Sequence, residues 1–473
     1  MNEKLSKANR PLTMRQQILY GLGDIAANPV YTLMVSFLTF FYTDVLGLNP
    51  ALIGTLILAC KVLDGISDII AGSIVERTHT AKGSARPWVL RFAVPLAAST
   101  VLLFTVPDVS VVEKLIYIFV TYNFAMSVCY TMFNAGLNSM PIYATNDVRT
   151  RSSAFAIRIV VGAVVQLLLT TFFMNIVGAF GGDQKAWIIF SIIIAAVSLA
   201  ASFIAYNSLE ENANPYLMNG HRTDDSSLTH ENKPSVMASL KALFRNKYWL
   251  MVVLLLAFVL FHQIATLSVG VYYATWILHD SLLAGKIALF HAGAMTVAIF
   301  AAPVLLNKGI SKRTICIGCS ISMLAGGILG MISGTSEILF YLSLVLRGAG
   351  YGIIAAVING MLSDSIVYGE WKTGIATPAL GMCAYTFVQK VMVGLVTALF
   401  GILLGALGYD GLAAAQPESA LRFIKLFFLY FPVILYVLQL LLLHFYKLDR
   451  EMPKILRDLE ERHDGTAQNA GNH

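Results

Sequence analysis

Residues 207–246 read NSLEENANPYLMNGHRTDDSSLTHENKPSVMASLKALFRN, and they form the one long polar segment of a 473-residue chain. Elsewhere the chain is strongly apolar: 57% of its residues are hydrophobic and 13% are charged. An ordinary soluble domain has about 25% charged residues. The core of a soluble domain stops growing near about 300 residues and leaves a polar surface, so this composition predicts a polytopic membrane protein.

Apolar runs flank the polar segment, six before it and six after it. Each run is continuous and long enough for a helix of about 20 residues, whereas a β-barrel would show alternating segments of about ten residues. We therefore expect an all-α polytopic membrane protein with about twelve transmembrane helices. The runs lie at roughly 17–43, 51–75, 88–107, 115–140, 153–180, 186–206, 247–278, 283–306, 313–333, 337–363, 375–408 and 423–446.

The polar segment divides the chain into two six-helix halves, an arrangement typical of the major facilitator class, in which a midplane site lies between two rocking halves. The end of the segment, Val236–Asn246, has apolar residues at helical spacing and predicts a short helix on the membrane surface. The domains that we expect are an N-terminal half, a cytoplasmic central linker, a C-terminal half and a cytoplasmic tail, at 1–206, 207–246, 247–447 and 448–473.

Lysine and arginine accumulate in alternate loops, as they do in cytoplasmic loops. The N-terminal tail, the linker and the C-terminal tail all belong to the basic set, so we expect both termini in the cytoplasm and the chain in the bacterial inner membrane. The first apolar run is too long for the core of a cleaved signal peptide and predicts a retained span. The net charge of +6 is spread over these loops, so nucleic acid is not an expected partner.

The sequence offers no catalytic centre. Its cysteines lie inside apolar runs and predict neither a disulfide framework nor a polar metal site, at Cys60, Cys129, Cys316, Cys319 and Cys383. No Ser/His/Asp arrangement or zinc-ligand spacing is present. We therefore expect no enzymatic activity and no cofactor.

The second apolar run contains charged residues that are costly in a bilayer. Lys61, Asp64, Ser67 and Asp68 recur at three- and four-residue spacing and so share one helix face. Two carboxylates one turn apart repel, so one takes up a proton or an inorganic cation lies between them. This pattern predicts a coupling site for Na⁺ or H⁺, with Asp64 and Asp68 as metal ligands if the ion is Na⁺. The alternative is a buried packing pair in which Lys61 neutralises one aspartate.

Further ionisable residues occur in other runs. Asp24 lies among small residues in the first run and could accept hydrogen bonds from sugar hydroxyls; the alternative is a packing kink. Arg158 and Lys390 are cations in otherwise apolar runs from opposite halves. Substrate contact and pure ion pairing remain alternatives for both. Arg347 adds a further cation at a depth that the sequence leaves open.

Several motifs, in this order along the chain, resemble those of the glycoside–pentoside–hexuronide:cation symporters, the major-facilitator family that includes melibiose permease. The similarity covers nearly the whole chain. The motifs are YGLGD at 20–24, FYTDVLGL at 41–48, Asp64-x-x-x-Asp68, RPW at 86–88, Arg151 with Arg158, VYY at 271–273, YGEWKTG at 368–374, and Lys390.

This resemblance implies roles for individual residues. The cation site would consist of Asp64, Ser67, Asp68 and Thr131, and the sugar would be surrounded by Asp24, Tyr130, Asn134, Asn138, Arg158 and Lys390. The chain departs from melibiose permease at positions that bear on sugar and ion choice. Asn134 occupies the position of a sugar-binding aspartate of melibiose permease, and Asn138 stands close to the position of one of its tryptophans. Three further residues of this chain replace others in melibiose permease: Lys61 an arginine, Ser67 an asparagine and Ile69 a proline.

The leading hypothesis is a secondary active symporter that couples uptake of a glycoside, oligosaccharide or uronide to Na⁺ or H⁺ by alternating access. The alternatives are a lipid or amphiphile transporter of the same fold and a membrane sensor that has lost transport. The exchange of an aspartate for Asn134 favours an anionic sugar, unless Asp24 and the second-run aspartates already neutralise the cations. We expect a monomer whose other contacts are with membrane lipid.

Overall fold

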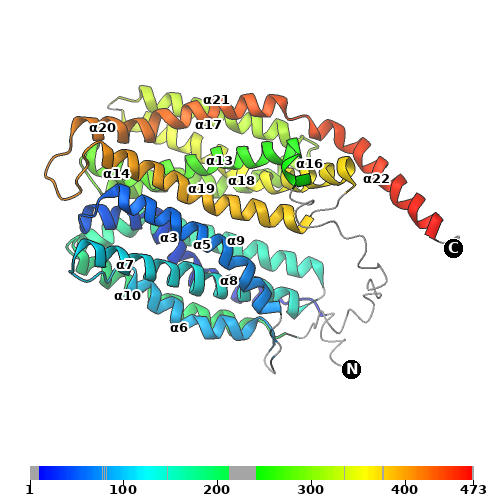
Figure 1. Ribbon diagram of the computed structural model, residues 1–473, viewed down its shortest axis with the longest axis horizontal. Coiled ribbons are helices and arrows are strands. Elements are labelled where there is room, and N and C mark those ends of the chain that lie inside the picture. The colour runs from blue at the N-terminus through cyan, green and yellow to red at the C-terminus, as the bar shows by residue number, and fades with distance from the viewer. Residues whose placement is uncertain are drawn as a thin grey trace. The chain divides into compact units, whose positions relative to one another are not determined.

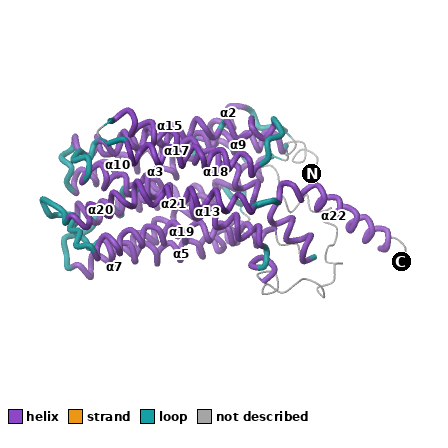
Figure 2. The backbone as a smooth tube through the Cα atoms, turned by 90° about the horizontal axis from the view of Figure 1, so that it is seen from above, coloured by secondary structure: helices purple, strands orange, loops and turns teal. Residues whose placement is uncertain are grey.

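The computed structural model describes residues 10–76, 78, 80, 83–145, 147–211, 241–334, 336–374 and 378–470. Helices and their connecting loops make up this described part of the chain, as Figure 2 shows. The β-structure found there is one isolated bridge between Thr80 and Gly83. Residues 236–240 of the predicted surface helix at 236–246 lie outside the described residues, and Lys241–Phe244 are helical.

The first half of the chain forms the helices coloured blue to cyan in Figure 1. Its first span is built from short pieces and ends in a π-helix, while the later spans are longer. The elements are α2 (Met14–Gly21), α3 (Asp24–Ser36), α4 (Leu38–Phe40), η1 (Phe41–Val45), α5 (Pro50–Glu76), α6 (Arg86–Leu102), α7 (Val111–Asn123), η2 (Phe124–Tyr130), α8 (Thr131–Ala144), α9 (Val148–Ala179) and α10 (Gln184–Ser208).

The second half repeats this pattern of apolar helices. Its last span also contains a π-helical turn, and a further helix follows that span. The elements are α13 (Lys247–Leu267), α14 (Val269–Trp276), α15 (Leu283–Ile299), α16 (Ala301–Asn307), α17 (Lys312–Ile332), α18 (Glu337–Thr373), α19 (Pro378–Ala406), α20 (Glu418–Lys425), η4 (Leu426–Tyr430), α21 (Phe431–Phe445) and α22 (Leu448–Ala470).

The predicted fold class is confirmed. Within the described residues, 10 helical segments are long and apolar enough to cross a membrane. The apolar helices α5, with 27 residues, and α6, with 17 residues, occupy the second and third predicted runs and bring the total to the expected twelve.

Polar residues placed just before the apolar runs start several of these helices. Each side chain accepts a hydrogen bond from the backbone N–H three residues later and so satisfies a donor that the helix itself leaves open. The Thr150 hydroxyl donates to Asp147, the N-cap of α9, and holds the pKa of that carboxyl below its ordinary value. The caps are Ser110, Asp147, Asp183, Ser311 and Ser336.

The described helices fall into two compact units that group the chain differently from the predicted halves. The first unit comprises Met1–Thr229, Thr266–Leu289 and Val393–Lys425. The second comprises His230–Ala265, Phe290–Met392 and Leu426–His473. Segments of the C-terminal part therefore pack into the first unit together with the N-terminal helices.

Glycines permit this close packing inside the first unit. A Cβ at Gly54 of α5 would lie 2.9 Å from the Cα of Ala398 on α19, which is closer than real contacts allow. A Cβ at Gly285 of α15 would collide with the carbonyl oxygen of Thr171 on α9. These contacts fix α19 and α15 against helices that precede the linker.

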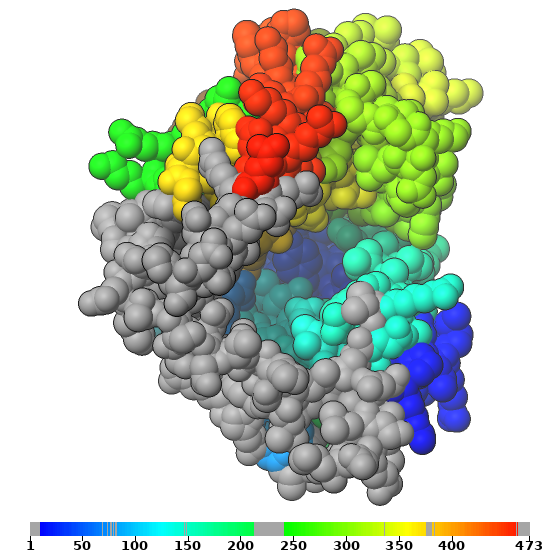
Figure 3. Space-filling view, turned by 90° about the vertical axis from the view of Figure 1, so that its right-hand side faces the viewer, coloured from blue at the N-terminus to red at the C-terminus, as the bar shows by residue number. Residues whose placement is uncertain are grey.

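Two hydrogen bonds attach α22 within the second unit. The Tyr248 hydroxyl donates to Glu451 at 2.9 Å, and the Trp371 indole donates to Asp458 at 2.9 Å. Figure 3 shows α22, in red, at the molecular surface. The tail predicted at 448–473 therefore begins as a docked helix.

Candidate substrate and cation sites

Arg158 joins three predicted sugar-site residues into one network within the first unit. Its Nε lies 2.8 Å from Asp24 Oδ1 in an ion pair. One terminal nitrogen donates to Asn134 Oδ1 at 2.7 Å and the other donates to Asn138 Oδ1. The planar guanidinium suits such a fork, because its five donors have fixed directions.

Local sequence places Asp24 in this network. The carboxylate lies in the first turn of α3, where the positive end of the helix dipole favours an anion. A Cβ at Gly162 of α9 would collide with Asp24 Oδ2, so only glycine leaves room for the carboxylate beside Arg158. Asn28 donates to the same oxygen at 3.3 Å.

The network has unused hydrogen-bonding capacity. Asn134 Nδ2 is buried and has no hydrogen-bond partner among the described residues. The side chains of Arg158 and Asp24 keep 11% and 14% of their exposure, and Asn138 is exposed. A ligand with hydroxyl groups would therefore meet the exposed Asn138 amide and the partly exposed Arg158–Asp24 pair, whereas the Asn134 amide donor lies out of its reach in this structure.

An aromatic pair lies near this polar network. The rings of Tyr31 on α3 and Tyr130, the last residue of η2, stack with centroids 5.9 Å apart. Stacked aromatic rings offer a flat apolar surface of the kind that lines pockets for small ligands. Tyr130 is thus well placed for the role that the family resemblance implies.

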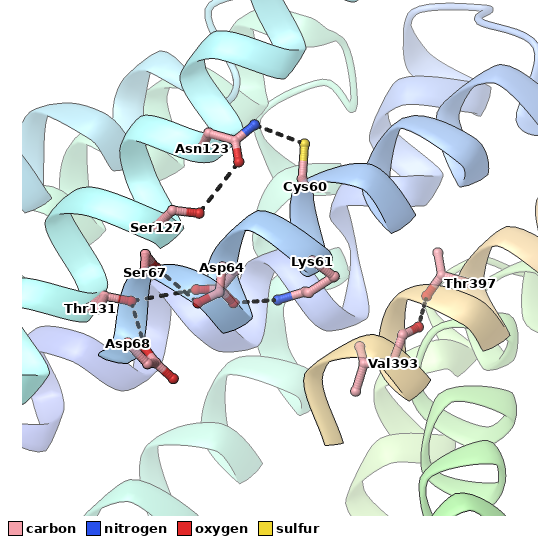
Figure 4. A network of polar contacts seen from close by, with 10 residues as sticks. All are labelled: Cys60, Lys61, Asp64, Ser67, Asp68, Asn123, Ser127, Thr131, Val393 and Thr397. Carbon is pink, nitrogen blue, oxygen red and sulfur yellow. Dashed lines mark hydrogen bonds and ion pairs between the residues drawn. The ribbon is translucent and has the colours of Figure 1, made fainter. Parts of the chain in front are cut away.

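The predicted cation-site residues also gather, as Figure 4 shows. The Thr131 hydroxyl on α8 lies 3.4 Å from Asp64 Oδ1 and 3.1 Å from Asp68 Oδ1, both on α5. The Ser67 hydroxyl donates to the Asp64 carbonyl at 2.8 Å, so its oxygen lies close to the same turn. Two carboxylates and a hydroxyl are hard oxygen ligands suited to Na⁺ or to a shared proton.

Lys61 balances part of this negative charge. Its Nζ lies 3.5 Å from Asp64 Oδ2, and Lys61 is only 3% exposed. The ammonium also lies 6.0 Å from the Tyr31 ring centroid and 5.7 Å from that of Tyr122. Three ionisable groups in one buried cluster, two acidic and one basic, leave room for one more positive charge.

One face of α8 connects the two networks. Thr131, Asn134 and Asn138 follow at three- and four-residue spacing, so they project from the same side of the helix. Thr131 contacts the two aspartates and the asparagines contact Arg158. The two networks are therefore joined through α8.

The second unit contains Lys390, and its side chain on α19 is half-buried. Its implied place among the residues that surround the sugar stays a prediction. Among the described residues, no group of three or more His, Cys, Asp or Glu side chains forms a metal-binding cluster.

Arg347 is fully buried, which removes it from the residues that could meet a sugar. Its Nε donates to the Tyr436 hydroxyl at 3.3 Å, and that hydroxyl lies 2.6 Å from His262 Nδ1. His262 Nε2 in turn lies 2.9 Å from His291 Nε2. This network belongs to the interior of the second unit.

A further polar cluster at Asp44 was not assigned a role from the sequence. One carboxylate oxygen of Asp44, in η1, accepts hydrogen bonds from the indole of Trp276 at 3.1 Å and the hydroxyl of Tyr409. The other oxygen accepts from Thr43, whose hydroxyl lies 2.7 Å from that of Tyr272. The quoted motif at 41–48 was the available signal, but its partners come from distant segments.

We expect Asp44→Ala to lower the initial rate of sugar uptake at least about tenfold, while sugar affinity in binding assays changes little. The substitution removes acceptors that join η1 to α14 and to Tyr409 within the first unit, and one hydrogen bond to a charged group is worth about 1.5–3 kcal/mol. We expect these contacts to stabilise one state of the transport cycle, so that their loss slows turnover more than it weakens sugar binding. Asp410→Ala, an exposed carboxylate close in sequence to Tyr409, is the control; wild-type uptake by Asp44→Ala would contradict this role.

Comparison with known proteins agrees with the geometry. The model of a family described as MFS/sugar transport protein matches residues 19–450. The chain is 31% identical to the isoprimeverose transporter of Lactiplantibacillus pentosus, over 95% of this chain and 91% of that protein. It is 27% identical to a putative glycoside/cation symporter, YagG, of Escherichia coli (strain K12), over 95% of each.

Solved structures show the same fold. The D-xylose-proton symporter superposes with a TM-score of 0.57 at 15% identity, over 92% of this chain and 95% of that one. The family resemblance suggested by the motifs is confirmed, and this protein is a membrane transporter and not an enzyme. The chain belongs to the MFS/sugar transport protein family.

Proposed function

We propose that this protein is a secondary active symporter that takes up a neutral glycoside or oligosaccharide together with Na⁺ or H⁺ by alternating access. The observation that carries the proposal is the shared face of α8. It brings Thr131 to the aspartates of α5 and brings Asn134 and Asn138 to Arg158. Two ligand sites joined by one helix provide the differential contacts that coupling requires.

In this mechanism the cation neutralises the cluster on α5. Asp64 and Asp68 supply carboxylate oxygens, and the Ser67 and Thr131 hydroxyls complete the shell. The cluster has one more negative than positive charge, so occupation by Na⁺ or H⁺ lets it become neutral when the carrier reorients. Because the Thr131 hydroxyl contacts both aspartates, ion binding would also hold α8 in one rotational position about its axis.

In the sugar site, hydroxyl groups would exchange hydrogen bonds with residues of both halves. Asp24 and the exposed Asn138 carbonyl accept, and the Arg158 guanidinium donates. Tyr130 supplies an apolar ring face. We assign substrate binding to Asp24, Tyr130, Asn134, Asn138, Arg158 and, from the second half, Lys390.

Charge pairing favours a neutral sugar over a uronide. Asp24 already neutralises the positive charge of the Arg158 guanidinium in an ion pair. An anionic sugar would therefore gain little binding energy from that guanidinium. The relatives described above are named as sugar or glycoside carriers and give the amphiphile alternative no support.

The expected setting is the bacterial inner membrane. We propose that both termini are cytoplasmic, from the distribution of lysine and arginine, and that the protein works as a monomer. Lipid then surrounds the apolar side chains that the described helices expose, such as Ile159, Val297 and Ile338.

Uptake into reconstituted vesicles tests the proposal. We expect labelled isoprimeverose to accumulate under an inward Na⁺ or H⁺ gradient and to equilibrate when an ionophore dissipates that gradient. Methyl β-glucoside should compete at least as well as methyl β-glucuronide. Uptake that ignores both gradients would overturn symport, whereas stronger competition by the glucuronide would overturn only the neutral-sugar assignment.

A further inference from the structure

A basic cavity of about 350 Å³ lies within the second unit, where α13 begins and α18 ends. It is open to the surface: its charged lining residues, Arg245 and Lys372, are exposed, while its polar lining residues include the buried Asn246 and the exposed Thr373. No carboxylate is among the described residues that line it. The sugar and cation networks described above lie in the first unit, so they do not explain this cavity.

The cavity has a preorganised polar floor. Asn246 caps α13: its Oδ1 accepts hydrogen bonds from the backbone N–H groups of Tyr248 and Trp249 at 3.1 Å, and its Nδ2 donates to the Ser365 carbonyl at 2.6 Å. A Cβ at Gly369 would lie 2.7 Å from that Nδ2. Glycine at 369 therefore keeps Asn246 in place and the cavity open.

A third cation lies beside the cavity. Lys247 Nζ is 4.5 Å from the Tyr248 ring centroid and 5.8 Å from that of Tyr368, and Lys372 Nζ is 5.7 Å from the Tyr368 centroid. Two ammonium groups thus gather on one buried tyrosine ring. Among the described residues, no carboxylate forms an ion pair with Lys247, Lys372 or Arg245, in contrast to Lys312, which pairs with Asp364 on α18.

Folding alone explains only part of this arrangement. Lys372 lies in the last turn of α18, where the negative end of the helix dipole favours a cation. Arg245, however, lies two residues before α13 and Lys247 is its first residue, and the dipole disfavours positive charge at this end of the helix. The positive side chains of Arg245 and Lys247 lie at the positive N-terminal end of α13, and together they favour a bound anion.

We propose that this cavity binds a phosphate group through Arg245 and Lys372, carried by an anionic phospholipid or by a free phosphate ester. Tetrahedral phosphate oxygens match a guanidinium and an ammonium that approach from two helices. The cavity opens beside the first residue of a membrane span, at the end where cytoplasmic basic residues accumulate. Basic pockets at this depth bind lipid head groups.

Thermal unfolding of the purified full-length protein in uncharged detergent tests the proposal. The probes are dioctanoyl phosphatidylglycerol, inorganic phosphate and dioctanoylglycerol, which has the acyl chains without phosphate. We expect the first to raise Tm saturably, with half-saturation about thirtyfold higher for R245Q/K372Q. That factor corresponds to about 1 kcal/mol for each basic residue at about 1.4 kcal/mol per tenfold change.

Two further variants keep the test decisive. K308Q/K454Q removes the same charge from positions that are exposed, as Arg245 and Lys372 are, but lie outside the cavity; it should respond like the wild type, as should the charge-preserving R245K/K372R. A Tm increase with inorganic phosphate assigns a free phosphate, and an increase with the phospholipid alone assigns a lipid. Equal effects of dioctanoylglycerol, equal losses in R245Q/K372Q and K308Q/K454Q, or no shift with either phosphate probe would overturn the proposal.

Discussion

Asp64→Asn should abolish concentrative uptake, so that internal sugar never exceeds external sugar, while sugar exchange across the membrane persists. The Asp64 side chain is fully buried, lies 3.4 Å from the Thr131 hydroxyl and lies 3.5 Å from the Lys61 ammonium. Coupling free energies between two sites are typically about 1–3 kcal/mol, or about 5- to 150-fold in affinity. We therefore expect the driving ion to lose its effect on sugar affinity.

Vesicle uptake and counterflow measured side by side check this expectation. Because the substitution also removes the carboxylate beside buried Lys61, the variant K61Q/D64N separates lost coupling from lost folding. Asp108→Asn alters a fully exposed carboxylate and is the matched control. Gradient-driven accumulation by Asp64→Asn at the wild-type level would refute the assignment of the cation site.

Arg158→Lys should weaken sugar binding at least about thirtyfold, which corresponds to about 2 kcal/mol. Lysine keeps the charge but cannot contact Asp24, Asn134 and Asn138 together, because it carries one compact ammonium in place of a planar fork. Removing one partner of a charged pair at a binding site costs about 2–5 kcal/mol. The side chains of Arg158 and Asp24 retain 11% and 14% exposure, so solvent screens part of their interaction and we expect the loss to lie near the lower value.

The double variant D24N/R158Q distinguishes sugar contact from pure ion pairing. If the two residues only neutralise each other, removing both charges should restore transport, since no buried charge remains uncompensated. We expect no recovery, because the sugar loses its acceptor and donors together. Vesicle uptake together with equilibrium binding to purified protein gives the measurement, and Arg422→Gln, which breaks an exposed pair with Glu418, provides the control.

The fold could be predicted because each membrane span corresponds to a continuous apolar run in the sequence. The clustering of Lys61, Asp64, Ser67 and Asp68 could be predicted because these residues share one helix, so three- and four-residue spacing alone places them on one face. Placing Thr131 beside the two aspartates required the family resemblance, because a single sequence does not show how α8 packs against α5.

Contacts between distant segments escaped sequence reasoning. Asp44 lies at the end of an apolar run and counts as an ordinary terminal charge until Trp276 and Tyr409 are brought to it by packing. Arg347 shows the converse: its depth was open in the sequence, and a tyrosine, a histidine pair and a phenylalanine carbonyl enclose it. Side-chain partners of this kind depend on tertiary packing, which periodicity does not encode.

The π-helix η2 ends immediately before Thr131, so the number of residues in η2 determines which way the side chains of α8 point. A π-turn accommodates one residue more than an α-turn, and each residue of an α-helix advances the facing direction by about 100°. Loss of a single residue between Phe124 and Tyr130 would turn Thr131 and Asn134 away from their partners, although every side chain that contacts an ion or a sugar would still be present. Activity in this helix thus depends on residue count as much as on residue identity, and indels here are more damaging than substitutions.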